Sequence, residues 1–185
     1  VNGNALGSAT LRTQPTATGM QIQSMQLRAP NQAIDVQGSW TGRGARAQTR
    51  LQTTLRSEDF GGLATRLGFA NQLKKGRGDV AMSLAWPGAP SDFVAAGLQG
   101  ELTMNVRDGQ LVSLEPGAGR LLGLFSMTRL PQRLTLDFRD FFDKGFAFDR
   151  IEGKVAFGGG LARSQGLTIE GPAAQIRISG SANMV

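Results

Sequence analysis

Residues 45–56 read ARAQTRLQTTLR, and this stretch decides the fold class. Alanine, leucine and threonine occupy its odd-numbered positions, while arginine, glutamine and threonine occupy the even-numbered ones. Such alternation is typical of a β-strand that buries one face and exposes the other to water. The predicted inner face comprises Ala45, Ala47, Thr49, Leu51, Thr53 and Leu55. We therefore predict an antiparallel sheet with one apolar and one polar face.

The same alternation recurs along much of the chain. It predicts strands at residues 79–86, 98–107 and 133–139, with shorter apolar runs at 161–169 and 176–178. Glycine is frequent, with 26 residues, which favours many short strands and turns over a helical bundle. The turn signals between the runs are Pro87-Gly88-Ala89-Pro90, Asp108-Gly109 and Gly158-Gly159-Gly160.

Two of the predicted strands change phase along their length. Their apolar residues move from even to odd positions between Ile22 and Met25, and again between Phe148 and Ile151. We predict a β-bulge at each place, because one extra residue restores the facing of the side chains and bends the sheet.

Two segments break the alternation and predict short amphipathic helices. Residues 59–69, DFGGLATRLGF, place Phe60, Leu63 and Leu67 on one helical stripe, with Ser57 or Asp59 as the N-cap. Residues 116–130, PGAGRLLGLFSMTRL, begin with proline in the first turn. Both segments are short and contain glycine, so neither would be stable without packing against the sheet.

The composition excludes several classes of function. The chain has no cysteine and no histidine, which removes disulfides, thiolate metal sites, the usual general base and the commonest metal ligand. Its net charge of +6 is dispersed, and the phenylalanines and arginines alternate onto opposite strand faces, so nucleic acid is not an expected partner. We expect no cofactor and no metal.

Two motifs have a catalytic or ligand-binding interpretation beside a structural one. Acidic residues in the last third of the chain could pair for glycoside hydrolysis, but neighbouring basic residues also explain them as exposed ion pairs. The stretch 116–120, PGAGR, could hold an anion at a helix start or form a tight turn. The acidic residues are Asp137, Asp140, Asp143, Asp149 and Glu152.

The two predicted helices are too small to cover the apolar face of the predicted sheet. About ten strands, each ~25 Å long and ~4.8 Å apart, make a face of about 1,200 Å². Two helices of about 11 residues cover about 350 Å² of it. The sheet must therefore close into a barrel, fold into a sandwich, or remain an open trough filled by a ligand.

A long stretch of the sequence resembles a known family. Residues 116–157 read PGAGRLLGLFSMTRLPQRLTLDFRDFFDKGFAFDRIEGKVAF. Supporting matches are Ser57-Glu58-Asp59-Phe60-Gly61, Leu84-Ala85-Trp86-Pro87-Gly88, and Gly171-Pro172-Ala173-Ala174 with Ile176, Ile178 and Gly180. On these residues the chain resembles the C-terminal region of the YhdP-type members of the AsmA-like family.

The resemblance implies a fold, a location and a function. Such proteins are large components of the Gram-negative envelope, anchored in the inner membrane by one N-terminal helix and built of repeated β-groove units. It implies phospholipid movement across the periplasm and offers no catalytic residues. Residues 1–185 are then one β-rich fragment whose anchor lies elsewhere, consistent with its start at Val1 and its lack of an apolar stretch of about 18 residues. The expected partners are phospholipid and the rest of the parent chain.

Under this resemblance the expected fold is a curved antiparallel sheet, an open β-groove or partly closed barrel, with two short amphipathic helices. The predicted groove lining is Val80, Met82, Leu84, Trp86, Leu102, Met104, Val106, Leu134, Leu136 and Phe138. The helix at 116–130 either contacts a membrane surface or plugs the sheet, through Arg120, Leu121, Leu122, Leu124 and Phe125. The alternative functions are a non-catalytic docking module of the envelope, whose protein partner the sequence does not identify, and an enzyme.

Overall fold

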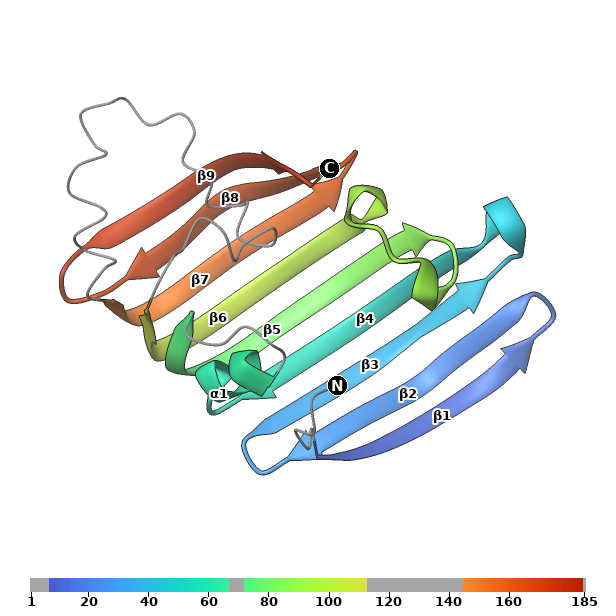
Figure 1. The fold of residues 1–185 in the computed structure, drawn as a ribbon, viewed down its shortest axis with the longest axis horizontal. Helices are drawn as coiled ribbons and strands as arrows, with labels where there is room; N and C mark the ends of the chain where they lie inside the picture. Colours follow the sequence, from blue (N-terminus) through green and yellow to red (C-terminus); the bar gives the residue numbers. More distant parts are fainter. Residues whose placement is uncertain (1–6, 67–71, 113–144, 185) are drawn as a thin grey trace.

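A computed structural model describes residues 7–66, 72–112 and 145–184 (Figure 1). There the chain forms one antiparallel sheet in which every strand pairs with its neighbours in sequence. The strands are β1 (Ser8–Thr16), β2 (Gly19–Ala29), β3 (Gln32–Thr41), β4 (Gln48–Ser57), β5 (Leu73–Pro87), β6 (Gln99–Leu111), β7 (Phe146–Gly158), β8 (Leu161–Glu170) and β9 (Gln175–Asn183). Because β1 and β9 are the edges of the described sheet, it is open. The predicted mainly β, antiparallel fold is confirmed in its open form.

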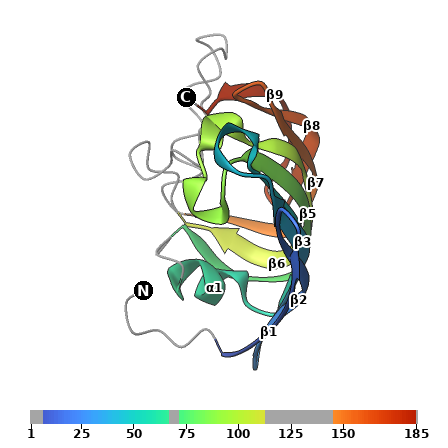
Figure 2. The ribbon, with the colours of Figure 1, turned by 90° about the vertical axis from the view of Figure 1, so that its right-hand side faces the viewer.

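The sheet is curved, with a concave and a convex face. Figure 2 shows the helix α1 (Phe60–Arg66) and the connection between β5 and β6 on the concave side. That connection contains two single 3₁₀ turns, Pro90–Asp92 and Ala95–Gly97. Within the described ranges, no helix has the length and hydropathy that crossing a membrane requires.

Strand pairing aligns the apolar residues of successive strands in continuous rows, because directly opposed residues of an antiparallel pair lie on the same face. One row passes from β2 to β6 through Leu27, Ile34, Leu55, Val80 and Met104. The next passes from β2 to β7 through Met25, Val36, Thr53, Met82, Leu102 and Val155. Rows on the opposite face are polar, such as Gln37, Gln52, Ser83 and Glu101. The apolar rows form the concave face.

Helix α1 closes one end of the concave face. The Asp59 carboxylate accepts a hydrogen bond from the Gly62 N–H at 2.9 Å and so caps the helix start. Phe60 and Leu63 are buried against the sheet. Gly61 is required for this close approach, because a Cβ there would lie 2.7 Å from the carbonyl oxygen of Leu73. The predicted helix at 59–69 is observed as far as Arg66, and its remainder lies outside the described residues, as do the predicted helix at 116–130 and strand at 133–139.

The predicted strand at 45–56 begins later than its alternation indicates. Residues Gly44–Arg46 form a 3₁₀ turn, and the strand starts at Gln48. The chain turns here because Gly42 and Gly44 adopt positive φ values of 87° and 54°. From Thr49 to Leu55 the side chains face as predicted.

Of the two predicted bulges, the first is confirmed and the second takes a different form. The β2–β3 register shifts between Ile22 and Met25. Between Phe148 and Ile151, β7 keeps one register with β6: Phe148 pairs with Gly109, and Ile151 with Val106.

The phase change in β7 is instead shared by its neighbours β5 and β6. Lys75 and Asp108 adopt left-handed backbone there, with φ values of 56° and 57°. The prediction of a turn at Asp108-Gly109 is therefore wrong, since both residues lie inside β6. The glycine turn at 158–160 is confirmed: Gly159 and Gly160 join β7 to β8 with φ values of 61° and 70°.

Candidate functional site

The predicted groove residues that the structure describes share the concave face. Strand register pairs Val80 with Met104 and Met82 with Leu102, and Leu84 lies opposite Leu51. Leu134, Leu136 and Phe138 lie outside the described residues, as do Arg120, Leu121, Leu122, Leu124 and Phe125.

Two of the predicted lining residues lie at the two ends of the lining and are buried beneath other elements. Trp86 is 7% exposed beneath the β5–β6 connection, where its Nε1–H donates to the Ala89 carbonyl at 3.1 Å. Val106 is also 7% exposed and packs in the core formed with Phe60 of α1. Between these two ends the lining is half-buried, and it comprises Val80, Met82, Leu84, Leu102 and Met104.

The lining extends over strands that the sequence-based site did not include. Met25 and Leu27 of β2, and Ile34 and Val36 of β3, continue the same rows and are also half-buried. Leu51 and Leu55 of β4 connect them to β5. The alternation at residues 45–56 could have predicted this extension, because its inner face includes Leu51 and Leu55 of the same concave surface.

Exposure of the concave face falls steadily across the sheet. Leu11 on the edge strand β1 is 60% exposed, the lining of β2–β5 is half-buried, and Val155 on β7 is 2% exposed. The buried cluster at the far side consists of Phe60, Leu63, Val106, Phe146, Phe148, Ile151, Leu167 and Ile169. The apolar face is thus open towards β1 and filled towards β7 and β8.

The convex face carries charged residues, some of which form exposed ion pairs. Arg77 contacts Asp108 at 2.8 Å and Arg150 contacts Glu152 at 3.6 Å. Of the acidic residues considered for hydrolysis, Asp149 and Glu152 are exposed, while Asp137, Asp140 and Asp143 lie outside the described residues. Among the described side chains, no group of three or more acidic, histidine or cysteine residues could hold a metal.

The side chains of the two concave rows form a surface that is suited to contact with hydrocarbon chains. Thr53 is the one hydroxyl in the two rows that run from β2 through Met82 and Val80, and the remaining members are aliphatic or methionine side chains. Such a surface removes apolar area from water but offers almost no donor or acceptor to fix a polar group.

Comparison with known proteins agrees with this geometry. A family model described as YhdP protein matches residues 1–185. The chain belongs to this family. The predicted YhdP-type resemblance is therefore confirmed.

A curated member of the YhdP family gives a second comparison. The chain is 29% identical over 153 residues to the protein named intermembrane phospholipid transporter YhdP of Escherichia coli strain K12. The match covers 82% of this chain and 12% of that transporter, so the chain spans a small part of its relative's length. No solved structure shows a significant match.

Proposed function

We propose that this chain is a segment of a lipid-transfer protein and that its concave face shields phospholipid acyl chains from water. The observation that carries the proposal is the pair of half-buried rows that crosses β2–β6 and is apolar except for Thr53. Membership of the YhdP family, and the name of its phospholipid-transporting relative, support lipid as the occupant.

The rows define a path for the acyl chains. They run across the strands, so an acyl chain lying along a row contacts one side chain from each successive strand. Each methylene removed from water contributes about 0.8 kcal/mol, with no directional bond. Binding of this kind favours sliding along the groove over fixation at one place.

In this proposal the residues have distinct roles. The acyl-chain contacts are Val80, Met82, Leu84, Leu102 and Met104, joined by the rows on β2–β4. Trp86 and Val106 bound the groove along the strand direction, beneath the β5–β6 connection and α1. Lipid contact by Leu134, Leu136 and Phe138, and cap or membrane contact by Arg120, Leu121, Leu122, Leu124 and Phe125, remain predictions.

For the parent protein, we propose a periplasmic position between the inner and outer membranes, with the membrane anchor outside residues 1–185. The support for this part is the family alone.

The test is a matched pair of charge substitutions on β5. Leu84→Glu places a carboxylate on the concave face, whereas Ser83→Glu places the same charge on the adjacent, exposed residue of the polar face. Native mass spectrometry of the gently purified chain should detect phospholipid in the wild type and in Ser83→Glu, and little or none in Leu84→Glu. Circular dichroism should show all three folded.

Two results would overturn the proposal. One is a wild-type chain that carries no phospholipid under any mild preparation. The other is equal loading of Leu84→Glu and Ser83→Glu. A lipid-free chain that instead captures one envelope protein specifically would support the non-catalytic docking module.

A further inference from the structure

We propose that the end of the sheet formed by the β3–β4 and β5–β6 connections docks on an anionic phospholipid bilayer. This inference rests on the proposed lipid-transfer function, and it concerns a surface separate from the groove lining. The surface, here called the docking end, consists of Arg43, Arg46, Phe93 and Val94.

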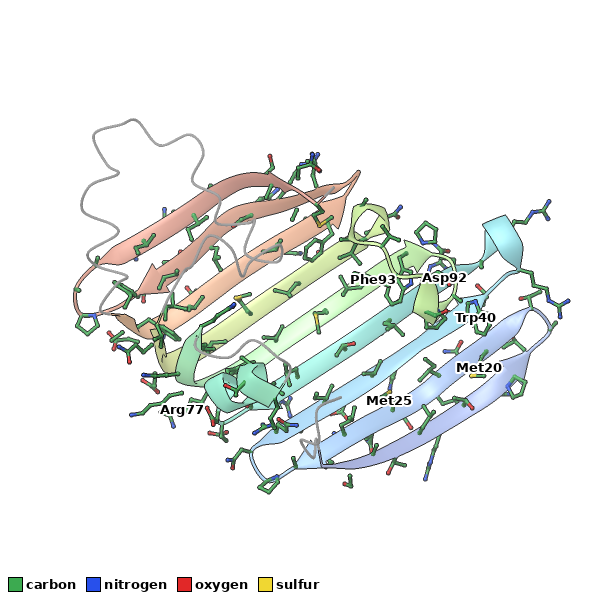
Figure 3. The ribbon with its side chains drawn as sticks, viewed as in Figure 1. Met20, Met25, Trp40, Arg77, Asp92 and Phe93 are labelled. Atoms are coloured by element: carbon green, nitrogen blue, oxygen red, sulfur yellow. The ribbon has the colours of Figure 1, made fainter. Side chains whose placement is uncertain are left out.

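The docking end concentrates exposed apolar side chains. Phe93 is 50% exposed and Val94 is 62% exposed. Figure 3 shows Asp92 and Phe93 towards the end of the sheet opposite the end where Arg77 lies. Large apolar groups gathered at one exposed place mark an interaction surface.

Contacts within the β5–β6 connection hold Phe93 in place. The Asp92 carboxylate accepts hydrogen bonds from the Ala89 N–H at 2.9 Å and from the Ser91 hydroxyl at 3.1 Å. Trp86 contacts Phe93 edge-to-face, with ring centroids 5.4 Å apart. The Phe93 ring is therefore fixed from one side, so little conformational freedom remains to be lost on insertion.

The neighbouring connection is tied to the same end and is basic. The Gly88 N–H donates to the Ala47 carbonyl at 2.8 Å, which joins the β3–β4 and β5–β6 connections. Arg43 and Arg46 are exposed, and neither forms an ion pair with a described residue. Asp92 is the one acidic residue in these two connections, and its oxygens are engaged within the loop.

The docking end combines exposed apolar side chains with exposed arginines, and its binding partner must match both. A protein partner would have to place carboxylates opposite both Arg43 and Arg46 beside its apolar patch. An anionic bilayer satisfies both, because aromatic and aliphatic side chains enter the acyl boundary while arginines meet lipid phosphates. We therefore assign this surface to a membrane containing anionic lipid.

The first experiment measures flotation of the 185-residue chain with vesicles. The wild type should float with vesicles of phosphatidylcholine and phosphatidylglycerol, and less with phosphatidylcholine alone. The double variant Phe93→Ser/Val94→Ser should lose about tenfold or more in affinity. Arg43→Gln and Arg46→Gln should each lose about fivefold on anionic vesicles only. Leu11→Ser, an equally exposed apolar change on the β1 edge, is the matched control and should bind as the wild type.

A second experiment locates the contact. Because the chain has no cysteine, Val94→Cys gives a single thiol for a polarity-sensitive fluorophore, with Leu11→Cys as control. Anionic vesicles should shift the emission of the label at position 94 to the blue and leave the label at position 11 unchanged. Equal shifts at both positions, no flotation of the wild type, or unchanged binding of the Phe93→Ser/Val94→Ser variant would overturn the docking surface.

The two proposals fail separately. Leu84→Glu should lose its lipid load and still float, while Phe93→Ser/Val94→Ser should keep its load and not float. Loss of vesicle binding in a chain that still carries phospholipid removes the docking surface alone. Vesicle binding by a chain that never carries phospholipid removes the groove function alone.

Discussion

Strands β2–β6 and strands β7 and β8 carry the same kind of apolar face, but the first region is half-open and the second is filled. In the filled region, Phe146 and Phe148 are each 2% exposed, and α1 packs on the same cluster through Phe60 and Leu63. In the half-open region, Met25 and the β5 side chains stay half-buried.

The half-open and filled regions differ in the types of apolar side chain that they use, as well as in how deeply those side chains are buried. The filled region contains three phenylalanines, at positions 60, 146 and 148, whose rings pack in defined geometries. The half-open rows include Met25, Met82 and Met104, whose flexible thioether side chains adapt to an occupant of variable shape. One region is thus built for stability and the other for a changing occupant, and the following substitutions test that contrast.

The largest expected effect is in the filled region. Phe148→Ala should lower the free energy of unfolding by about 3–5 kcal/mol, because it leaves a cavity beneath α1. Urea denaturation followed by circular dichroism measures this. A loss below about 1 kcal/mol would mean that the cluster does not hold the sheet together.

Removing the cap of α1 should have a smaller effect on the same region. Asp59→Ala deletes the acceptor for the Gly62 N–H and should cost about 1 kcal/mol. Asp59→Asn retains an acceptor and should recover most of the loss. Equal denaturation midpoints for Asp59→Ala and the wild type would show that the helix contributes nothing to the closed end.

In the half-open region, truncation should cost less stability. Met82→Ala removes a half-buried side chain and should lower the free energy of unfolding by about 0.5–1 kcal/mol in lipid-free protein. The loss should grow when phospholipid is present, because the truncated groove binds it less well. A loss as large as that for Phe148→Ala would erase the distinction between the two regions.

The smallest expected effect is on the convex face. Arg77→Ala breaks the exposed pair with Asp108 and should change stability by at most about 0.5 kcal/mol, with little change in lipid load. Moderate salt should remove even this difference. A larger effect would assign the convex face a structural role that its exposure does not indicate.

The sequence predicts the facing of the strands well, and long-range packing explains what it misses. Alternation alone places Leu51, Leu84 and Leu102 on one face, since a side chain's face depends only on its position in the strand. Alternation also extends the β4 strand wrongly into residues 45–47, because nothing in that pattern registers the positive φ of Gly42 and Gly44.

Burial is the property that the sequence pattern does not contain. Met82 and Val155 alternate identically and belong to one row, yet the first is half-buried and the second is 2% exposed. The phase change after Phe148 is accompanied by left-handed backbone at Lys75 in β5 and Asp108 in β6. It does not involve a bulge in the pairing of β7 with β6. Groove and core are therefore distinguished by neighbouring elements and not by the strands themselves.

The most direct test of the central claim is site-specific photo-crosslinking on adjacent residues of β5. A benzophenone amino acid replaces either Met82, on the concave face, or Ala81, which is exposed on the convex face. The account predicts phospholipid adducts, identified by mass spectrometry, from position 82 and none from position 81. Adducts in equal yield from both positions, or from position 81 alone, would contradict the assignment of the concave face as the lipid-holding surface.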